Sequence, residues 1–233
     1  MNTGSCGRSE MEWALWRTFV RARMRGSSEI PKVFRTRIKR LLEIDRALDL
    51  DGEEVPPEAS YAFAVPPEFG ESAYQPIDAF CLAIALDLLD AGFKQTEVVF
   101  LMRYLRSELE DRYSGFLRPP SLNDRQWHRA IDHPDLPVWT DKRRSSADNR
   151  TFLIIQKIEI TEIFPLLAKH KGKMPIFQTF IFCEGLTALS ARLHDLMPQR
   201  RRALSIVEVA ATAQSIQYYF ENAPRIRRGR PKS

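Results

Sequence analysis

The last nine residues of this 233-residue chain combine arginines with a glycine and a proline, a composition that suits the minor groove of DNA. These residues include Arg225, Arg227, Arg228, Gly229, Arg230, Pro231 and Lys232. The minor groove over A·T pairs is narrow and strongly negative, so it accepts extended arginine side chains. Glycine lets the backbone sit deep in the groove, where a Cβ atom would collide. The sequence therefore predicts a basic, disordered tail at 224–233 that binds the minor groove.

Within this tail, the run Arg228-Gly229-Arg230-Pro231 resembles the AT-hook, a short minor-groove motif built on Arg-Gly-Arg-Pro. The resemblance covers these residues only, and it implies double-stranded DNA rich in A·T pairs as the partner. The alternative interpretation is a solvated basic tail without a DNA-binding role, because short basic patterns recur by chance.

A second group of candidate DNA contacts lies in the middle of the chain, where two helices are predicted on either side of Gly92. The first, 78–90, is almost entirely apolar, and the second starts at the capping residue Thr96. The side chains expected to read bases from the second helix are Lys94, Gln95, Thr96, Arg103 and Arg106. A turn glycine followed by such a helix is how a helix-turn-helix presents its recognition helix. A buried helical hairpin is the alternative, favoured by the acidic residues nearby.

The same stretch resembles part of the MerR family of transcription regulators. In that family a Tyr, an Asp, a Leu four residues later and a Gly-Phe pair fourteen residues later precede a Glu-Ile helix. The matching residues here are Tyr74, Asp78, Leu82, Gly92, Phe93, Glu97 and Val98. The resemblance covers about 25 residues of the chain. The family's own reading helix and wing would precede this unit, where this chain has an acidic, proline-rich loop, so no base-contacting residue is carried over.

Charge is distributed unevenly along the chain, although the net charge is only +5. Residues 17–46 contain ten Lys or Arg and three acids, whereas residues 47–93 contain ten acids and no Lys or Arg. Residues 200–233 are again basic, with eight Lys or Arg against two acids. Two basic ends favour contact with nucleic acid. Alternatively, the blocks attract one another and determine domain packing or dimerisation.

Enzyme chemistry finds little support in the residue pattern. The chain has no Gly-x-Gly-x-x-Gly loop, no Gly-Lys-Ser run and no Gly-x-Ser-x-Gly elbow. His128 and His133 stand five residues apart, with no cysteine beside them, which does not match the usual spacing of metal ligands. Cys81 and Cys183 lie in apolar segments and are expected to be unreactive core residues. We therefore predict no catalytic residue, no metal and no cofactor.

The predicted fold is α+β and mainly α-helical. The segments are basic N-terminal helices at 1–48, an acidic proline-rich loop at 49–76, the helix-turn-helix-like unit at 77–115, an irregular linker at 116–150, a β-hairpin plus helices at 151–223 and the tail at 224–233. The hairpin is expected near 151–183, and the loop at 49–76 should contain at most a short strand at 61–65. The first helix should start at the capping residue Ser9, with Glu12 completing a capping box, and run to Gly26.

Two further helices are predicted near the C-terminus. The first, at 185–197, should turn Leu186, Leu189, Leu193 and Leu196 inward. The second should be capped by Ser205 with Glu208 and end near Phe220. Its small-residue face, which includes Ala210 and Ala213, suits either core packing or a homodimer seam.

Taken with the charge pattern, these features predict a sequence-preferring DNA-binding protein that acts as a transcription regulator. Three scattered cysteines favour the reducing cytoplasm, and no run of about 20 apolar residues is present to span a membrane. The alternative is a non-catalytic protein-interaction or scaffold module with a basic tail. The oligomeric state, the target sequence and the regulatory output stay open.

Overall fold

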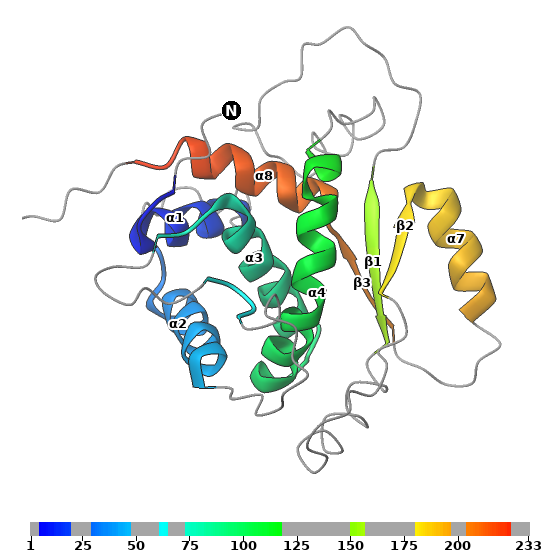
Figure 1. The fold of residues 1–233 in the computed structure, drawn as a ribbon, viewed down its shortest axis with the longest axis horizontal. Helices are drawn as coiled ribbons and strands as arrows, with labels where there is room; N and C mark the ends of the chain where they lie inside the picture. The colour runs from blue at the N-terminus through cyan, green and yellow to red at the C-terminus, as the bar shows by residue number, and fades with distance from the viewer. Residues whose placement is uncertain are drawn as a thin grey trace, which may run out of the picture.

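The computed structural model describes residues 5–19, 29–47, 61–64, 73–117, 150–156, 180–196 and 204–224 (Figure 1). The elements are α1 (Arg8–Phe19), α2 (Lys32–Ala47), α3 (Pro76–Asp90), α4 (Gln95–Phe116), β1 (Thr151–Gln156), β2 (Ile181–Glu184), α7 (Gly185–Leu196), β3 (Leu204–Glu208) and α8 (Ala210–Glu221). The prediction of an α+β, mainly helical fold is confirmed. The predicted linker between 118 and 149 and the tail at 225–233 lie outside the described residues.

Helix α3 forms the centre of the core because its sequence is apolar on nearly every side. Every residue from Ala79 to Leu86 is buried. The helix starts at Pro76 after a reciprocal cap, in which the Gln75 backbone N–H donates to Asp78 at 2.8 Å. It ends before Gly92, whose φ of 86° is a left-handed conformation that glycine adopts without strain. The chain then reverses into α4, so the predicted two-helix unit exists as a helical hairpin.

Helix α1 starts close to its predicted position but uses a different cap. The Gly7 backbone N–H donates to the Glu10 carboxylate at 2.7 Å, so α1 begins at Arg8 and Ser9 lies within its first turn. The predicted extension of this helix beyond Phe19 lies outside the described residues. In α2, Phe34, Ile38, Leu41 and Leu42 are buried together, as their helical spacing predicted.

The described strands form an antiparallel sheet in the order β2-β1-β3. The predicted hairpin is confirmed, since β1 pairs with β2 through Phe152 opposite Cys183 and Leu153 opposite Phe182. Strand β3 was not predicted: Ser205, expected to cap a helix, pairs with Ile155 instead. Helix α8 begins only at Ala210. Residues 61–64, where the sequence predicted a loop with at most a short strand, form a bend.

The two faces of the sheet pack against different partners. Leu153 and Ile155 join the main core with α8, whereas Ile154 and Cys183 contact α7 through Leu189. Leu186 of α7, predicted to face inward, is 48% exposed. Figure 1 shows α7 on the far side of the sheet from the helical core. The small-residue face of α8 packs against α1 and α3, which is the core-packing alternative rather than a free seam.

Candidate nucleic-acid interface

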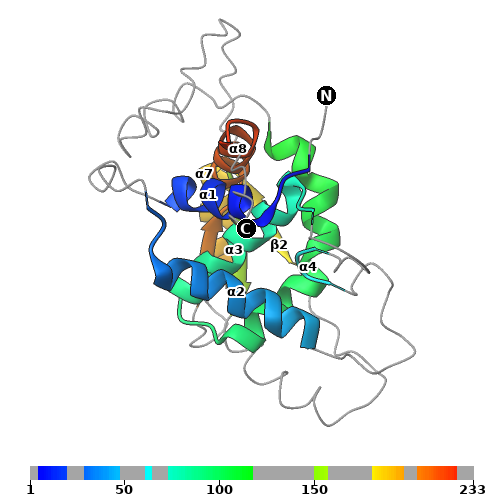
Figure 2. The same ribbon diagram turned by 90° about the vertical axis from the view of Figure 1, so that its left-hand side faces the viewer.

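Helix α2 presents a cationic surface to solvent. Its buried residues all lie on one face, so the remaining positions point outward. The exposed cations on it are Lys32, Arg35, Lys39, Arg40 and Arg46, and the exposed acid among them is Glu43. In Figure 2, α2 runs along the side of the molecule that is nearest the viewer. Five cations against one acid make this surface attractive to phosphate groups.

Several of these cations also make ion pairs. Arg35 lies 3.6 Å from Glu12 of α1, and Lys39 lies 3.4 Å from Glu43 one turn later on α2. Within the described part of the chain, Lys32 and Arg40 form no ion pair. Exposed pairs of this kind contribute little to stability and exchange readily with other charged partners. Lys32 and Arg40 are therefore available to an anionic ligand, and Arg35 and Lys39 can exchange their partners for one.

Arg37 anchors α2 to the C-terminal end of α3. Its Nη2 atom lies 2.6 Å from Asp90 and donates to the Leu86 carbonyl oxygen at 3.4 Å. Asp87 lies one turn before the end of α3, where the charges of Arg37 and Asp90 both affect its pKa. Burial and the nearby Asp90 together raise the pKa of Asp87 to about 7, although Arg37 acts to lower it. The contact holds the buried side of α2 in place while leaving its outer side open.

Helix α4 does not have the exposed face that a recognition helix requires. All residues from Glu97 to Arg103 are buried, so two consecutive turns are covered on every side. Arg103, predicted to read bases, is 4% exposed, and its Nε atom lies 2.9 Å from the Asp45 carboxylate. The guanidinium also donates to the Asp45 carbonyl oxygen. The base-reading role of Arg103 is therefore corrected: its charge is held in the core, where a base edge cannot approach.

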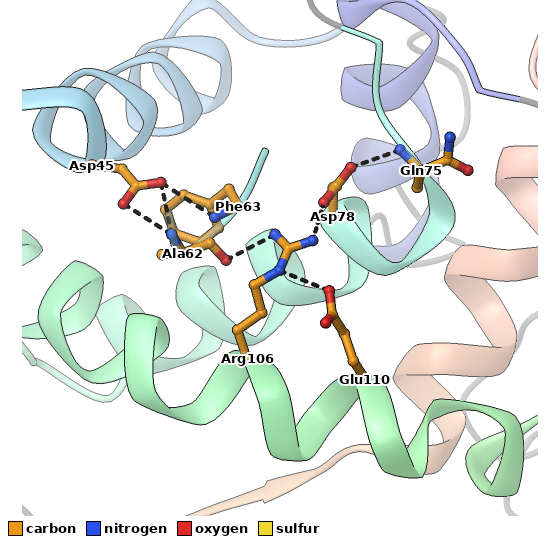
Figure 3. Close-up of polar contacts among 7 residues, drawn as sticks. All are labelled: Asp45, Ala62, Phe63, Gln75, Asp78, Arg106 and Glu110. Carbon is orange, nitrogen blue, oxygen red and sulfur yellow. Dashed lines mark hydrogen bonds and ion pairs between the residues drawn. The ribbon is translucent and has the colours of Figure 1, made fainter. Parts of the chain in front are cut away.

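Arg106, the other predicted reading arginine, occupies a polar network between three segments (Figure 3). Its Nη2 atom lies 2.7 Å from Asp78 of α3, its Nε atom lies 2.8 Å from Glu110, and Nη1 donates to the Ala62 carbonyl oxygen at 3.4 Å. Burial raises the pKa of Asp78, while the Gln75 N–H and Arg106 lower it. With carboxylates on two sides, this guanidinium connects α3, α4 and the bend at 61–64, and its predicted reading role is corrected too.

Lys94, Gln95 and Thr96 stay near the surface at the start of α4, but their setting is acidic. Lys94, and not Thr96, is the cap residue, and its backbone N–H donates to Glu97 at 2.9 Å. Asp90, four residues before Lys94 in the chain, is also exposed, and the exposed positions at the far end of α4 include Glu110, Asp111 and Arg112. Like charge opposes binding to phosphates. The central hairpin is therefore mostly buried, which answers the question that its sequence left open.

The tail, with its predicted minor-groove residues, follows directly after the described part of α8. That helix ends at Glu221, and the described chain ends at Pro224. Helix α8 packs along α1, which in turn contacts α2. Figures 1 and 2 place the C-terminal end of α8 on the side of the molecule that carries α1 and α2. The tail therefore starts on the same side as the cationic surface of α2.

Other chemistry has weak support among the described residues. Within them, no group of three or more His, Cys, Asp or Glu side chains is arranged to hold a metal ion. Burial raises the pKa of Cys6 and Cys81 to about 12, and burial also raises the pKa of Cys183, so these thiols are poor nucleophiles at neutral pH. In the described part of the chain, no helix combines the length and apolar character that crossing a membrane requires.

No family model, curated protein or solved structure matches this chain. The similarity to the AT-hook and to MerR regulators rests on short runs of residues. In the MerR-like run, Tyr74 pairs with Cys6 through backbone hydrogen bonds, and Asp78 and Glu97 cap helices. These residues therefore have structural roles in this fold.

Proposed function

We propose that this protein is a sequence-preferring, double-stranded-DNA-binding transcription regulator. The observation that carries the proposal is the outward face of α2, where exposed cations outnumber acids on a helix held firmly by its buried side. The folded part of the protein contacts DNA through α2, which belongs to the predicted basic N-terminal helices, and not through α4. The protein acts by binding, and its cysteines suit the reducing cytoplasm.

The tail supplies a second contact in this proposal. An extended chain of nine residues spans at most about 30 Å, which is enough to reach a groove beside the folded domain. Its arginines occupy an A·T-rich minor groove, while α2 contacts phosphates. Because the two contacts belong to one chain, the second forms at a high effective concentration and increases the overall affinity.

The test is a titration of the full chain and of a 1–224 truncation against A·T-rich and G·C-rich duplexes, at about 50 mM and about 200 mM salt. We expect the full chain to prefer the A·T-rich duplex and to weaken steeply with salt. The truncation should lose the A·T preference and keep weaker, salt-sensitive binding through α2. Sedimentation of the complex gives its stoichiometry and tests whether the protein binds DNA as a homodimer.

A matched pair of variants separates α2 from a general effect of positive charge. The combined substitution Lys32→Ala, Lys39→Ala and Arg40→Ala should reduce binding to every duplex and lower the salt slope by about 2 to 3. The control removes three exposed cations elsewhere, through Lys94→Ala, Arg112→Ala and Arg192→Ala, and should have a much smaller effect. If the full chain binds no duplex at either salt concentration, the proposal fails and a protein-interaction module takes its place.

A further inference from the structure

The outward face of α2 has cations along both edges and a strip of mixed composition between them. With successive side chains about 100° apart around a helix, Arg35, Lys39 and Arg46 project along one edge. Arg40 projects along the other edge, and Arg37, which is held by Asp90 and the Leu86 carbonyl oxygen, lies on the core side of that edge. The strip between the edges consists of Lys32, Thr36, Glu43 and Ala47, at intervals of four, seven and four residues. Cations on both sides of a central strip fit two rows of phosphate groups better than they fit one flat anionic surface.

We infer that α2 lies in the major groove of duplex DNA, with one cationic edge on each phosphate backbone and with Thr36 and Glu43 facing the base edges. This inference rests on the proposed function. The major groove is about 12 Å wide, which matches the diameter of an α-helix with its side chains, whereas the minor groove is about 6 Å wide and excludes one. The opposite side of α2 packs on the core through Phe34, Ile38 and Leu41, so the protein body stays outside the groove.

The composition of the exposed face argues against an anionic membrane as the occupant. Membrane-surface helices bury a row of large apolar side chains between their cations. On the outward face of α2, Val33 is the large apolar residue that is strongly exposed, at 73%. One valine at the edge of the face cannot supply the apolar area that membrane binding needs.

Two residues of the middle strip, Thr36 and Glu43, have side chains that suit contact with bases. A glutamate carboxylate accepts a hydrogen bond from the N4 amino group of cytosine, and a threonine methyl packs on the methyl group of thymine. Glu43 also lies 3.4 Å from Lys39, which orients it along the helix axis. Base preference should therefore depend on Thr36 and Glu43, and overall affinity should depend on cations such as Arg40.

The experiment starts with selection of the preferred duplex from a random-sequence pool by the full-length protein. A panel of duplexes with single base-pair changes then measures the profiles of the wild type and of Glu43→Gln, Thr36→Ala and Arg40→Gln. Glu43→Gln should change the preferred base at one position from cytosine towards adenine, with relative affinities altered roughly 5- to 100-fold. Arg40→Gln should weaken all duplexes similarly and lower the salt slope by about 1.

Dimethyl sulfate interference provides an independent readout, because methylation of guanine N7 lies in the major groove and methylation of adenine N3 lies in the minor groove. We expect interference at guanines next to the position that Glu43→Gln changes. If the wild type binds but Glu43→Gln and Thr36→Ala keep its base profile, and guanine methylation does not interfere, α2 does not lie in the groove although DNA binding stands. Absence of binding by the wild type overturns the proposed function and this inference with it. Circular dichroism confirms that each variant is folded.

Discussion

Asp45 and Arg103 form a buried ion pair whose carboxylate has several partners. The Asp45 carboxylate accepts hydrogen bonds from the backbone N–H groups of Ala62 at 3.0 Å and Phe63 at 3.2 Å, and it lies 2.9 Å from Arg103. The two side chains are 2% and 4% exposed. Removing one member of such a pair leaves an uncompensated charge in the core. We expect Arg103→Met to lower the free energy of unfolding by about 3–5 kcal/mol, measured by urea denaturation.

The control for this substitution is Lys39→Met, which removes a cation from an exposed pair with Glu43 on the surface of α2. It should change the free energy of unfolding by less than about 1 kcal/mol, because solvent already screens the interaction. Equal losses from the two substitutions would mean that Arg103 is not held in the core as the structure places it.

The raised pKa of Asp87 makes the stability of the folded protein depend on pH. Burial, with help from Asp90, raises the pKa of Asp87 from an ordinary value of 3.8 to about 7 in the folded protein. The folded state therefore holds a proton between these values that the unfolded state has released. The contribution of Asp87 to stability is complete below about pH 4 and is lost as the pH rises through about 7. We expect Asp87→Asn to increase the free energy of unfolding at about pH 8 by roughly 1–3 kcal/mol, and to change it little at about pH 4.

The neighbouring Asp90→Asn should have the opposite sign in neutral solution. Asp90 lies 2.6 Å from Arg37, and the carboxylate of this pair is largely exposed, so its loss should cost less than about 1 kcal/mol. Urea denaturation across the pH range compares the two variants. If Asp87→Asn does not stabilise the protein above neutral pH, Asp87 is already ionised there and the burial argument fails.

At the level of elements, the sequence pattern was sufficient to predict a helix where the apolar residues followed a helical spacing or an unbroken run. The helical spacing of Phe34, Ile38 and Leu41 predicted α2, and the apolar run from Ala79 to Leu86 predicted a buried α3. Strand β3 was missed because its five residues precede a helix directly, and Ser205 with Glu208 has the spacing of a capping box. Pairing with β1, a contact distant in sequence, decided between strand and helix.

The predicted reading arginines failed for a related reason. Arg103 and Arg106 have polar side chains on a helix with one apolar stripe, so an outward position was the natural expectation. Their partners, Asp45 and Asp78, lie 58 and 28 residues earlier in the chain, and nothing local indicates the pairing. In α2, by contrast, the helical spacing of the apolar residues is enough to place Thr36, Arg40 and Glu43 on the outward face.

Glu208 joins the sheet to the last helix. Its carboxylate accepts hydrogen bonds from the backbone N–H groups of Ala210 at 3.1 Å, Ala211 at 2.7 Å and Thr151 at 3.3 Å. The first two are helix N-terminal donors, which otherwise lack partners within the helix, and the negative charge also suits the helix dipole. We expect Glu208→Ala to lower the free energy of unfolding by about 1–2 kcal/mol in urea denaturation.

A matched control lies on the other edge of the sheet. Glu184 ends β2, is exposed, and stands opposite Thr151 in the register of β1. Glu184→Ala should change stability by less than about 0.5 kcal/mol. If both variants lose the same amount, the capping hydrogen bonds of Glu208 contribute nothing beyond what any strand-end glutamate does.

In the whole molecule, the first and last helices close the core together (Figure 2). Trp13 of α1 and Tyr219 of α8 meet edge to face with ring centroids 6.0 Å apart. The Arg17 guanidinium lies 5.8 Å from the centre of one ring and 5.7 Å from the centre of the other. Residues from both ends of the chain belong to the same hydrophobic cluster as α3 and α4. Helix α1 therefore depends for its packing on the C-terminal helix.

This arrangement predicts opposite results from two truncations that differ by 15 residues. A chain that ends at residue 209 lacks α8 and loses the fully buried Ala213 and Ile216 together with Tyr219, so the core around α1 and α3 is left open. We expect it to lose the cooperative thermal transition and the near-ultraviolet circular dichroism of its tryptophans. A chain that ends at residue 224 keeps every described core residue, and its melting temperature should stay within about 2 °C of the full chain, since a shift of that size is less than about 1 kcal/mol. A cooperative transition in the 209 truncation would show that α8 is dispensable. A large drop in the melting temperature of the 224 truncation would mean that the tail stabilises the fold. Weaker DNA binding by that truncation could then no longer be assigned to lost minor-groove contacts.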